Sequence, residues 1–373
     1  MEFNPDPTKQ ATELLFSCKN NSPNHPPLYF NGAVVAKVND HKHLGLVLDS
    51  KLSFEKHINE KITKAKKNIG LLRHLSSFIP IQSLDQIYKT MVRSHLDYCD
   101  FIYHAPPLYH QPPLGFSLNC LMEKVEKVQY EAALAITGAW KGSSRSKLYD
   151  ELGWESLSDR RLCSRVKQIF KIANNLTPDY LAYKLPSHSR PLYDGGIRNS
   201  FRELICKSNR YKNSFFPDAI HCWNSIINHF ENMPSLVALR KHLNVLFRPD
   251  RKSIFGIHDP TGIRYLFQLR VKMSPLRSHK YQHNFEDTPT EMCSCGQGIE
   301  NTNHFLFTCS FFALERITLI DSVSHLLPQN DLELKTNECN LYLYGHPRLN
   351  KVENKSIIQA TICFIKESGR FST

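Results

Sequence analysis

The sequence predicts a mainly α-helical chain with a small β region near its N-terminal end, and three patterns carry this prediction. Strand-like runs alternate with turn residues over residues 12–49. From residue 54 onward the apolar residues change to helical spacing. A short segment rich in cysteine and histidine follows near the C-terminal end and indicates a small metal-binding module. The 373 residues are enough for two or three domains of roughly 100–200 residues each.

The β region contains a hairpin signal. Two strand-like runs, residues 28–30 and 33–38, flank the pair Asn31-Gly32, which favours a two-residue turn because both turn residues take positive φ. A third run, residues 43–49, follows closely. So short a region cannot close a β core by itself, so we expect the remnant of a larger domain, with exposed strand edges that favour aggregation.

Residues 54–77 are predicted to form a basic amphipathic helix. Ser53 can cap its start, and Pro80 lies just past its end. The other faces are mostly basic and carry only two acidic residues, Glu55 and Glu60. The apolar stripe consists of Ile58, Ile62, Ala65, Ile69, Leu72 and Leu75.

Further helices follow. Ser83 and Gln86 form a capping-box pattern that predicts a second helix, and a third is expected over about residues 118–137, after a proline-rich break at 106–113. These helices would form a small bundle with the first. Beyond it we expect helix over residues 145–185, a loop at 186–200, a helix around Trp223, a linker from Pro249 to Gly262, and a C-terminal module from about Ile263. The second helix's apolar stripe is Leu84, Ile87, Tyr88, Met91, Val92 and Leu96.

The charge balance favours a polyanionic partner. Lys and Arg outnumber Asp and Glu by 47 to 35, a net charge of +12, and nucleic acid is the commonest partner of so basic a protein. A merely basic soluble protein is the alternative. The N-terminus has neither a basic start nor an apolar core, so it is not a signal peptide. No run of 18 uncharged apolar residues occurs, so no membrane span is expected, and the predicted location is the cytoplasm or nucleus.

Eleven cysteines are present, and most of them are scattered singly, which does not resemble a disulfide framework. A reducing compartment is expected, with the lone cysteines packed as small apolar groups. These are Cys18, Cys99, Cys120, Cys163, Cys206, Cys222, Cys339 and Cys363.

The remaining cysteines form a cluster with the spacing Cys293-x-Cys295-x8-His304-x4-Cys309. Three thiolates and one imidazole suit tetrahedral Zn²⁺ in a structural role, and Gly296 permits the tight turn that such close ligands need. The last spacing matches a zinc knuckle, whereas the first is one residue shorter than the commonest pattern. The alternative is three unligated cysteines in a reducing compartment.

Residues 41–49, followed by Leu52-Ser53-Phe54 and His57-Ile58, resemble the junction between palm and thumb in reverse transcriptases of jockey-type non-LTR retrotransposons. The segment from Asn4 to Lys9 is similar to the one that follows the catalytic motif of that family. Further similar segments occur in the family's order along nearly the whole chain: residues 71–75, 84–88, 95–98, 126–129, 132–138, 148–154, 157, 160–161, 214–217 and 223–224, and then Leu269, Arg270, Ser274, Leu276 and Arg277 before the cysteine cluster.

The resemblance implies a division into four parts. Residues 1–52 would be the C-terminal remnant of the palm, and residues 53–140 a thumb-like helical bundle. Residues 141–260 would be a helical connector, and residues 261–373 a domain with a CCHC-type zinc knuckle.

Polymerisation in that family uses two Mg²⁺ ions held by paired aspartates. The sequence contains no Asp-Asp dipeptide, and Asp97-Tyr98-Cys99-Asp100 has the wrong order and falls in a predicted helix. We interpret Asp49 and Glu55 as boundary residues of a strand-to-helix turn. The chain is therefore expected to begin just after the catalytic turn and to lack polymerase activity, with Mg²⁺ needed only if the catalytic palm were present. Residues 310–373 show no nuclease motif either.

The resemblance implies RNA or an RNA–DNA duplex as partner. A thumb helix contacts phosphates without reading sequence, and a solvated helix face is the alternative. A knuckle binds RNA through a stacked aromatic residue; Phe305 and Phe307 are candidates, although we favour a core role for both. The predicted phosphate contacts are Lys56, Lys61, Lys64, Lys66, Lys67 and Arg73.

Other aromatic residues are interpreted structurally. Phe215, Phe216 and Trp223 are expected to be core anchors, and Tyr98 a buried tyrosine whose hydroxyl is hydrogen-bonded.

The leading functional hypothesis is a truncated reverse transcriptase that retains its nucleic-acid-binding thumb and knuckle. A domesticated RNA- or DNA-binding protein is the first alternative. The second is one part of an active RNA-directed DNA polymerase whose catalytic region is encoded upstream. The preferred RNA and the oligomeric state are left open.

Overall fold

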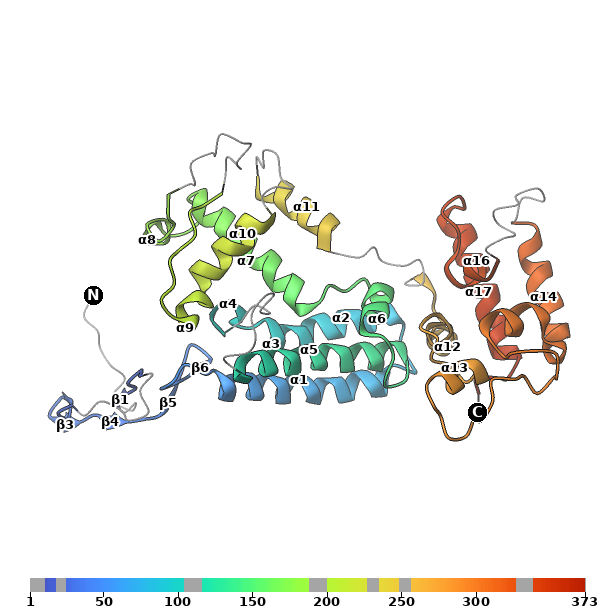
Figure 1. Cartoon of the computed structure of the whole chain (residues 1–373), viewed down its shortest axis with the longest axis horizontal. Coiled ribbons are helices and arrows are strands. Elements are labelled where there is room, and N and C mark those ends of the chain that lie inside the picture. The colour runs from blue at the N-terminus through green and yellow to red at the C-terminus, as the bar shows by residue number, and fades with distance from the viewer. Residues whose placement is uncertain are drawn as a thin grey trace. The chain divides into compact units, whose positions relative to one another are not determined.

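The computed structural model (Figure 1) describes residues 11–17, 25–103, 116–187, 200–226, 235–247, 256–326 and 338–372. It is about 60% helix and 6% strand, which confirms a mainly α fold with a few small sheets. The chain divides into two compact units, each built from separate stretches. The first contains residues 1–65, 95–127 and 158–240, and the second residues 66–94, 128–157 and 241–373. The four-part division stays a prediction.

Several sequence features lie outside the described residues. They are the segment from Asn4 to Lys9, Cys18, the proline-rich break at 106–113, most of the predicted loop at 186–200, and residues 249–255 of the predicted linker.

The predicted hairpin is confirmed. Strands β2 (Tyr29–Phe30) and β3 (Ala33–Val34) pair antiparallel across Asn31 and Gly32, whose φ angles are 49° and 78°. Positive φ at both positions is what this tight turn requires. Strand β1 (Thr12–Glu13) pairs in parallel with β4 (Ala36–Lys37), and each of these small sheets has two strands.

The run at residues 43–49 was predicted as one strand, and this is wrong. Leu44 and Gly45, with φ angles of 47° and 81°, form a turn between β5 (Asp40–His43) and β6 (Leu46–Asp49), which pair antiparallel. Leu46 and Val47 are buried in this second hairpin, whereas the side chains of β2 and β3 are exposed.

Helix α1 (Glu55–Leu75) follows with the predicted apolar stripe: Ile58, Ala65, Ile69 and Leu72 are buried, and Ile62 and Leu75 are half-buried. Its start is held chiefly by Asp49. The two carboxylate oxygens of Asp49 accept hydrogen bonds from the backbone N–H groups of Ser53 (3.0 Å) and Phe54 (2.9 Å). The predicted cap from Ser53 is weaker, with 3.4 Å between its Oγ and the N–H of Glu55. Asp49 is thus a boundary residue with a defined capping role.

Helix α2 (Ile81–Ile87) begins two residues before the predicted start. Pro80 occupies its N-cap without a side-chain hydrogen bond, so the capping box of Ser83 and Gln86 does not form. The fixed φ of proline starts the helix earlier, which places Ser83 within its first turn. The helix continues through η1 (Tyr88–Arg93), with π-type hydrogen bonds, into α3 (Ser94–Asp97).

The helix predicted across residues 97–100 is interrupted. Cys99 has a φ of 60°, and α4 (Asp100–Tyr103) starts after it. Helix α5 (Phe116–Thr137) then matches the third predicted helix.

The stretch predicted as helix over residues 145–185 consists of α6 (Arg145–Leu152), α7 (Leu157–Ala173) and α8 (Asp179–Ala182). Gly153, with a φ of 63°, ends α6 in the left-handed conformation that favours glycine. The helices α9 (Asn209–Lys212), α10 (Phe215–Ile226) and α11 (Leu236–Phe247) complete this part of the chain.

The first unit buries charged side chains that the sequence did not reveal. Arg161 and Arg165, one turn apart on α7, are each 1% exposed. The Arg165 Nε lies 2.5 Å from Asp218 of α10, and the Arg161 Nε lies 3.9 Å from Asp100 of α4. Burial raises the pKa of both aspartates, and their arginine partners oppose this effect.

The aromatic core of the first unit agrees in part with the prediction. Trp223 is buried and contacts the rings of Phe170 and Phe201, which confirms it as a core anchor. Phe215 and Phe216 are only half-buried and contact each other edge to face.

The core of the second unit contains a buried polar network. Tyr88 stacks on Trp154 with 3.8 Å between ring centroids, and its hydroxyl donates to Gln129 Oε1 at 2.6 Å. The Trp154 indole N–H donates to a carboxylate oxygen of Asp85 at 2.9 Å, and all four side chains are buried.

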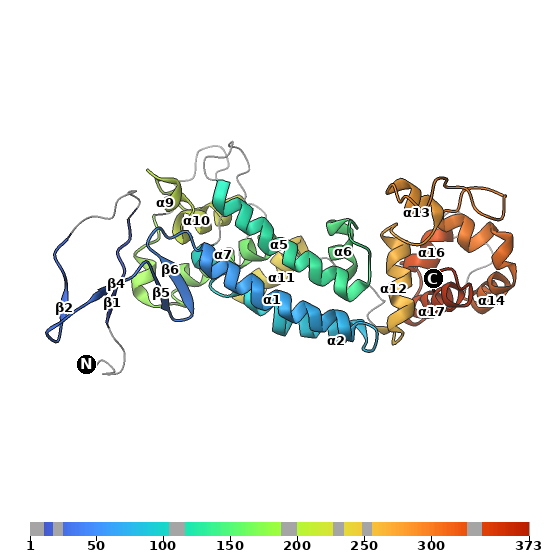
Figure 2. The same cartoon turned by 90° about the horizontal axis from the view of Figure 1, so that it is seen from below.

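The C-terminal stretch is helical. Helix α12 (Pro260–Arg270) begins inside the predicted linker, because Asp259 caps it by accepting from the Gly262 N–H and Pro260 suits its first turn. It is followed by α13 (Arg277–Gln282), η4 (His304–Thr308), η5 (Ser310–Phe312), α14 (Ala313–Ser324), α16 (Glu338–Tyr344) and α17 (Lys351–Glu367). In Figures 1 and 2, α12, α14 and α16 gather around α17. Among the residues described, no helix combines the length and apolarity that crossing a membrane needs.

Candidate metal centre and basic surface

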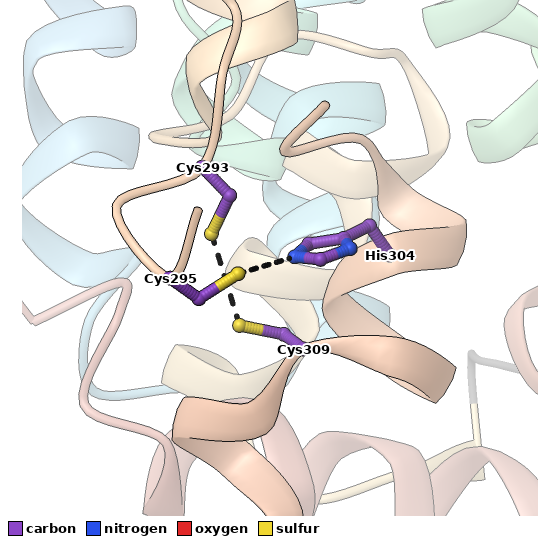
Figure 3. Close-up of side chains that lie close together, drawn as sticks. All are labelled: Cys293, Cys295, His304 and Cys309. Atoms are coloured by element: carbon purple, nitrogen blue, oxygen red, sulfur yellow. Dashed lines mark hydrogen bonds between the residues drawn. The ribbon is translucent and has the colours of Figure 1, made fainter. Parts of the chain in front are cut away.

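The structure brings the four predicted zinc ligands together (Figure 3). The Cys293 and Cys309 sulfurs are 3.7 Å apart, and 3.2 Å separates the Cys295 sulfur from His304 Nε2. All four ligand atoms lie within 4.8 Å of one another. Tetrahedral zinc with bonds of about 2.3 Å to sulfur separates two of its sulfurs by about 3.8 Å. The donor set and its size therefore fit one Zn²⁺.

Cys293 and Cys295 lie on a tight turn. Met292 forms an antiparallel bridge with Ile299, and the Cys293 N–H donates to the Gly298 carbonyl at 2.8 Å. Gly296, with a φ of 77°, makes the turn, as its position after Cys295 predicted. The short Cys-x-Cys spacing is therefore compatible with convergence of the two thiols.

His304 and Cys309 come from the other side of the centre. They stand five residues apart, at the two ends of the π-type turns of η4. The Cys309 N–H donates to the His304 carbonyl at 2.8 Å, and the Asn301 side chain accepts from the His304 N–H at 2.8 Å. The wider π turn brings residues five apart onto one side of the helix, so the x4 spacing directs both ligands to the same point.

Thr308 orients the histidine, a role that sequence reasoning missed. Its hydroxyl lies 2.9 Å from His304 Nδ1 and 3.4 Å from the His304 carbonyl oxygen. When Nε2 coordinates a metal, Nδ1 carries the proton and donates it to the Thr308 hydroxyl, which in turn donates to the carbonyl. This arrangement favours the tautomer that a metal at Nε2 requires.

The environments of two thiols differ. Burial raises the pKa of Cys293 to about 12. A hydrogen bond from the Gln297 backbone N–H lowers the pKa of Cys295. Of these two, Cys295 therefore becomes a thiolate more readily, and the thiolate is the form that binds zinc.

Phe305, a candidate for stacking on a base, is fully buried against Phe312 and Phe364, as expected for a core residue. Phe307 is half-buried and contacts Tyr342 edge to face. Phe311 is 62% exposed two residues after Cys309, and no pattern in the sequence distinguishes it from the other aromatic residues of this segment.

The predicted phosphate contacts of α1 differ in their surroundings. Lys56 forms an ion pair with Asp40 at 2.7 Å, and Lys66 lies 3.7 Å from Glu131. The Lys61 ammonium lies 3.9 Å from the centre of the Tyr98 ring. The other three side chains are exposed: Lys64, Lys67 and Arg73.

These residues do not share one helix face. With 3.6 residues per turn, Lys66 and Arg73 point roughly 120–180° away from Lys61 and Lys64. One straight duplex therefore cannot contact all of the predicted side chains at once.

The lone cysteines follow the expectation only in part. Cys222 is buried, and burial raises its pKa to about 12, which is typical of an unreactive core thiol. Cys120 and Cys363 are exposed, so packing as small apolar groups is wrong for them.

Comparison of the chain with protein-family models, with curated proteins and with solved structures gave no match.

Proposed function

We propose that this chain is an RNA-binding protein built on a zinc module and a basic helix, related to the C-terminal part of a jockey-type reverse transcriptase. One observation supports this proposal most strongly. The four residues that the spacing predicts as ligands lie together as a donor set that suits tetrahedral zinc, and the Thr308 hydroxyl lies within hydrogen-bond distance of His304 Nδ1.

The zinc would have a structural role. Four protein ligands fill a tetrahedral site and leave no position for a reacting water or substrate. Zinc bound here would link the turn at Cys293 and Cys295 to helix η4. It would so stabilise the position of two short segments that have little other regular structure.

The basic side chains of α1 support contact with RNA or an RNA–DNA duplex. Lysine and arginine bind phosphates without reading base sequence, and the net charge of +12 adds long-range attraction.

The acidic residues closest to a polymerase-like pattern have structural partners. Asp49 caps α1, Asp97 accepts a hydrogen bond from the Arg160 Nε at 2.8 Å, and Asp100 faces Arg161. Because these three carboxylates already have partners within the protein, they favour a binding role over metal-dependent polymerisation in this chain.

One observation favours the second candidate, a part of a larger active polymerase. Tyr29, Phe30 and Val34 on the β2–β3 hairpin are 66%, 43% and 56% exposed. Apolar side chains beside open strand edges suit packing against further strands. A transcript that joins this chain to an upstream frame with a Tyr/Phe-x-Asp-Asp turn would support that candidate. Stop codons directly upstream would exclude it.

Zinc content and RNA binding of the purified chain test the main proposal. We expect about one zinc per chain, with RNA affinity falling steeply between about 50 and about 200 mM salt. Cys293→Ser/Cys295→Ser should lose the zinc and weaken RNA binding. The matched control, Cys120→Ser/Cys363→Ser, removes two exposed thiols outside the cluster and should change neither property. A chain without zinc and without salt-dependent binding would contradict the proposal.

A further inference from the structure

Tyr98 joins three elements at one corner of the first unit. Its hydroxyl donates to the carbonyl of Leu44, in the turn between β5 and β6, at 2.6 Å. The Lys61 ammonium of α1 rests 3.9 Å from the centre of its ring. Tyr98 directly follows α3 and is 39% exposed, so the prediction that it is buried is wrong, although its hydroxyl is hydrogen-bonded as predicted. The ring therefore fixes the position of a positive charge beside solvent.

Three further basic residues lie around this corner. Lys42 of β5 pairs with Val47 of β6. The Val47 N–H donates to Nδ1 of His57 at 3.3 Å, and His57 lies one helical turn before Lys61 on α1. Lys64 is exposed and lies three residues after Lys61. His95 is half-buried on α3, three residues before Tyr98.

The charges act on one another. Burial lowers the pKa of Lys61, and the charges of Lys64 and Lys42 lower it further, while Cys99 and Glu60 oppose this. Burial and then the charges of Lys61 and Lys64 lower the pKa of His95, and no acidic group within the described part of the chain offsets them. Like charges held together in this way raise the free energy of the folded state unless an anion binds among them.

We infer that Lys42, Lys61, Lys64 and His95 form a phosphate-binding site for the backbone of a nucleic acid, and that binding adds a proton to His95. The inference rests on the proposed RNA-binding function and assigns its principal contact to one side of α1. It excludes Lys66, one of the phosphate contacts that the sequence predicts, because Lys66 lies on the other side of the helix and near Glu131.

The chemistry of the four groups suits a phosphodiester. Three ammonium groups can donate to its two free oxygens. Burial, and after it the positive charges of Lys61 and Lys64, lower the pKa of His95 and so favour its neutral form. A bound phosphate supplies the negative charge that favours protonation. By linkage, a site that takes up a proton on binding gains affinity as the pH falls, by up to about tenfold per pH unit.

The test uses the full chain and a fluorescently labelled RNA–DNA duplex, with anisotropy measured at constant ionic strength from about pH 5.5 to about pH 8. Lys64→Gln and Lys42→Gln should each weaken binding by about five- to tenfold. Each should also reduce the slope of log affinity against log salt concentration by about one. Lys66→Gln, the matched control, should change affinity by less than about twofold because Glu131 already offsets its charge. His95→Gln should remove the gain in affinity at low pH.

Circular dichroism should show the same thermal unfolding for the variants and the wild type, since Lys42 and Lys64 are exposed. If the wild type binds with strong salt dependence but Lys66→Gln weakens binding as much as Lys64→Gln, this site is wrong and the proposed function stands. A pH dependence that survives His95→Gln would exclude the proton uptake. A wild type that binds neither the duplex nor RNA at any salt concentration overturns both the site and the proposed function.

Discussion

The carboxylate of Glu300 accepts two hydrogen bonds from the guanidinium of Arg370, a residue 70 positions later in the chain. Arg370 Nε donates to Oε1 at 2.7 Å and Nη2 donates to Oε2 at 3.0 Å. The same Oε2 accepts from the backbone N–H of Arg277 at 2.9 Å. Glu300 directly follows the strand-like bridge that ends the Cys293 turn. The C-terminal end of the chain therefore holds the metal-binding turn in place.

Replacing Glu300 should lower stability. Glu300→Gln removes the negative charge opposite Arg370 and one acceptor, so we expect the free energy of unfolding to fall by about 2 kcal/mol. Chemical denaturation in the presence of zinc measures this change. Glu367→Gln, at an exposed position close to Arg370 in the sequence, should stay within about 0.5 kcal/mol of the wild type. Equal effects of the two substitutions would show that the pair with Arg370 contributes nothing.

Thr308 should set zinc affinity without being a ligand. Thr308→Val keeps the shape of the side chain but removes the acceptor for His304 Nδ1, so zinc affinity should fall about tenfold. Thr308→Ser keeps the hydroxyl and should bind zinc like the wild type. Competition with a zinc-sensitive dye gives both affinities. A valine variant as tight as the serine variant would mean that the hydroxyl does not orient the histidine.

Two glycines should respond to alanine in opposite directions. A Cβ at Gly45 would lie 2.5 Å from the Tyr98 hydroxyl oxygen, at a φ of 81°, so Gly45→Ala should destabilise the protein by about 1–3 kcal/mol. Gly70 lies within α1 with nothing within 4 Å of its Cβ position. Gly70→Ala should therefore stabilise the protein by up to about 1 kcal/mol. Thermal and urea unfolding of both variants would check the signs, and destabilisation by Gly70→Ala would contradict the open surroundings of that position.

His279 should make stability depend on pH. It is buried, its Nδ1 lies 2.7 Å from the Ser274 hydroxyl, and burial lowers its pKa to about 4 from an ordinary 6.5. Between these values the unfolded chain binds a proton that the folded chain does not. The free energy of unfolding should therefore rise with pH across this window, with a slope of up to about 1.4 kcal/mol per pH unit, and stay level above about pH 6.5.

The comparison with His279→Gln isolates this contribution. Acid also protonates the zinc ligands and the buried aspartates, but those groups are the same in both proteins. The difference in unfolding free energy between wild type and variant should change between about pH 4 and about pH 6.5 and be constant above that range. A constant difference throughout would show that His279 titrates normally in the folded protein.

Features set by neighbouring residues could be predicted. The turn at Asn31-Gly32, the stripe of α1 and the four zinc ligands all depend on residues a few positions apart, where turn chemistry, helical period and ligand spacing act directly. The failures are also local. Helix α2 begins after Pro80 and not at the predicted cap, Ser83. Leu44 and Gly45 form a turn inside a run whose composition predicts a single strand.

By itself, then, the sequence determined the mainly α fold, the first hairpin and the identity of the candidate zinc ligands. Only the tertiary structure decided where charge is buried. Asp85 accepts a hydrogen bond from Trp154, 69 positions away in the sequence, and Glu300 accepts one from Arg370, 70 positions away. A buried charge is stable only beside its partner, and nothing in the local sequence of either residue identifies a partner so distant along the chain.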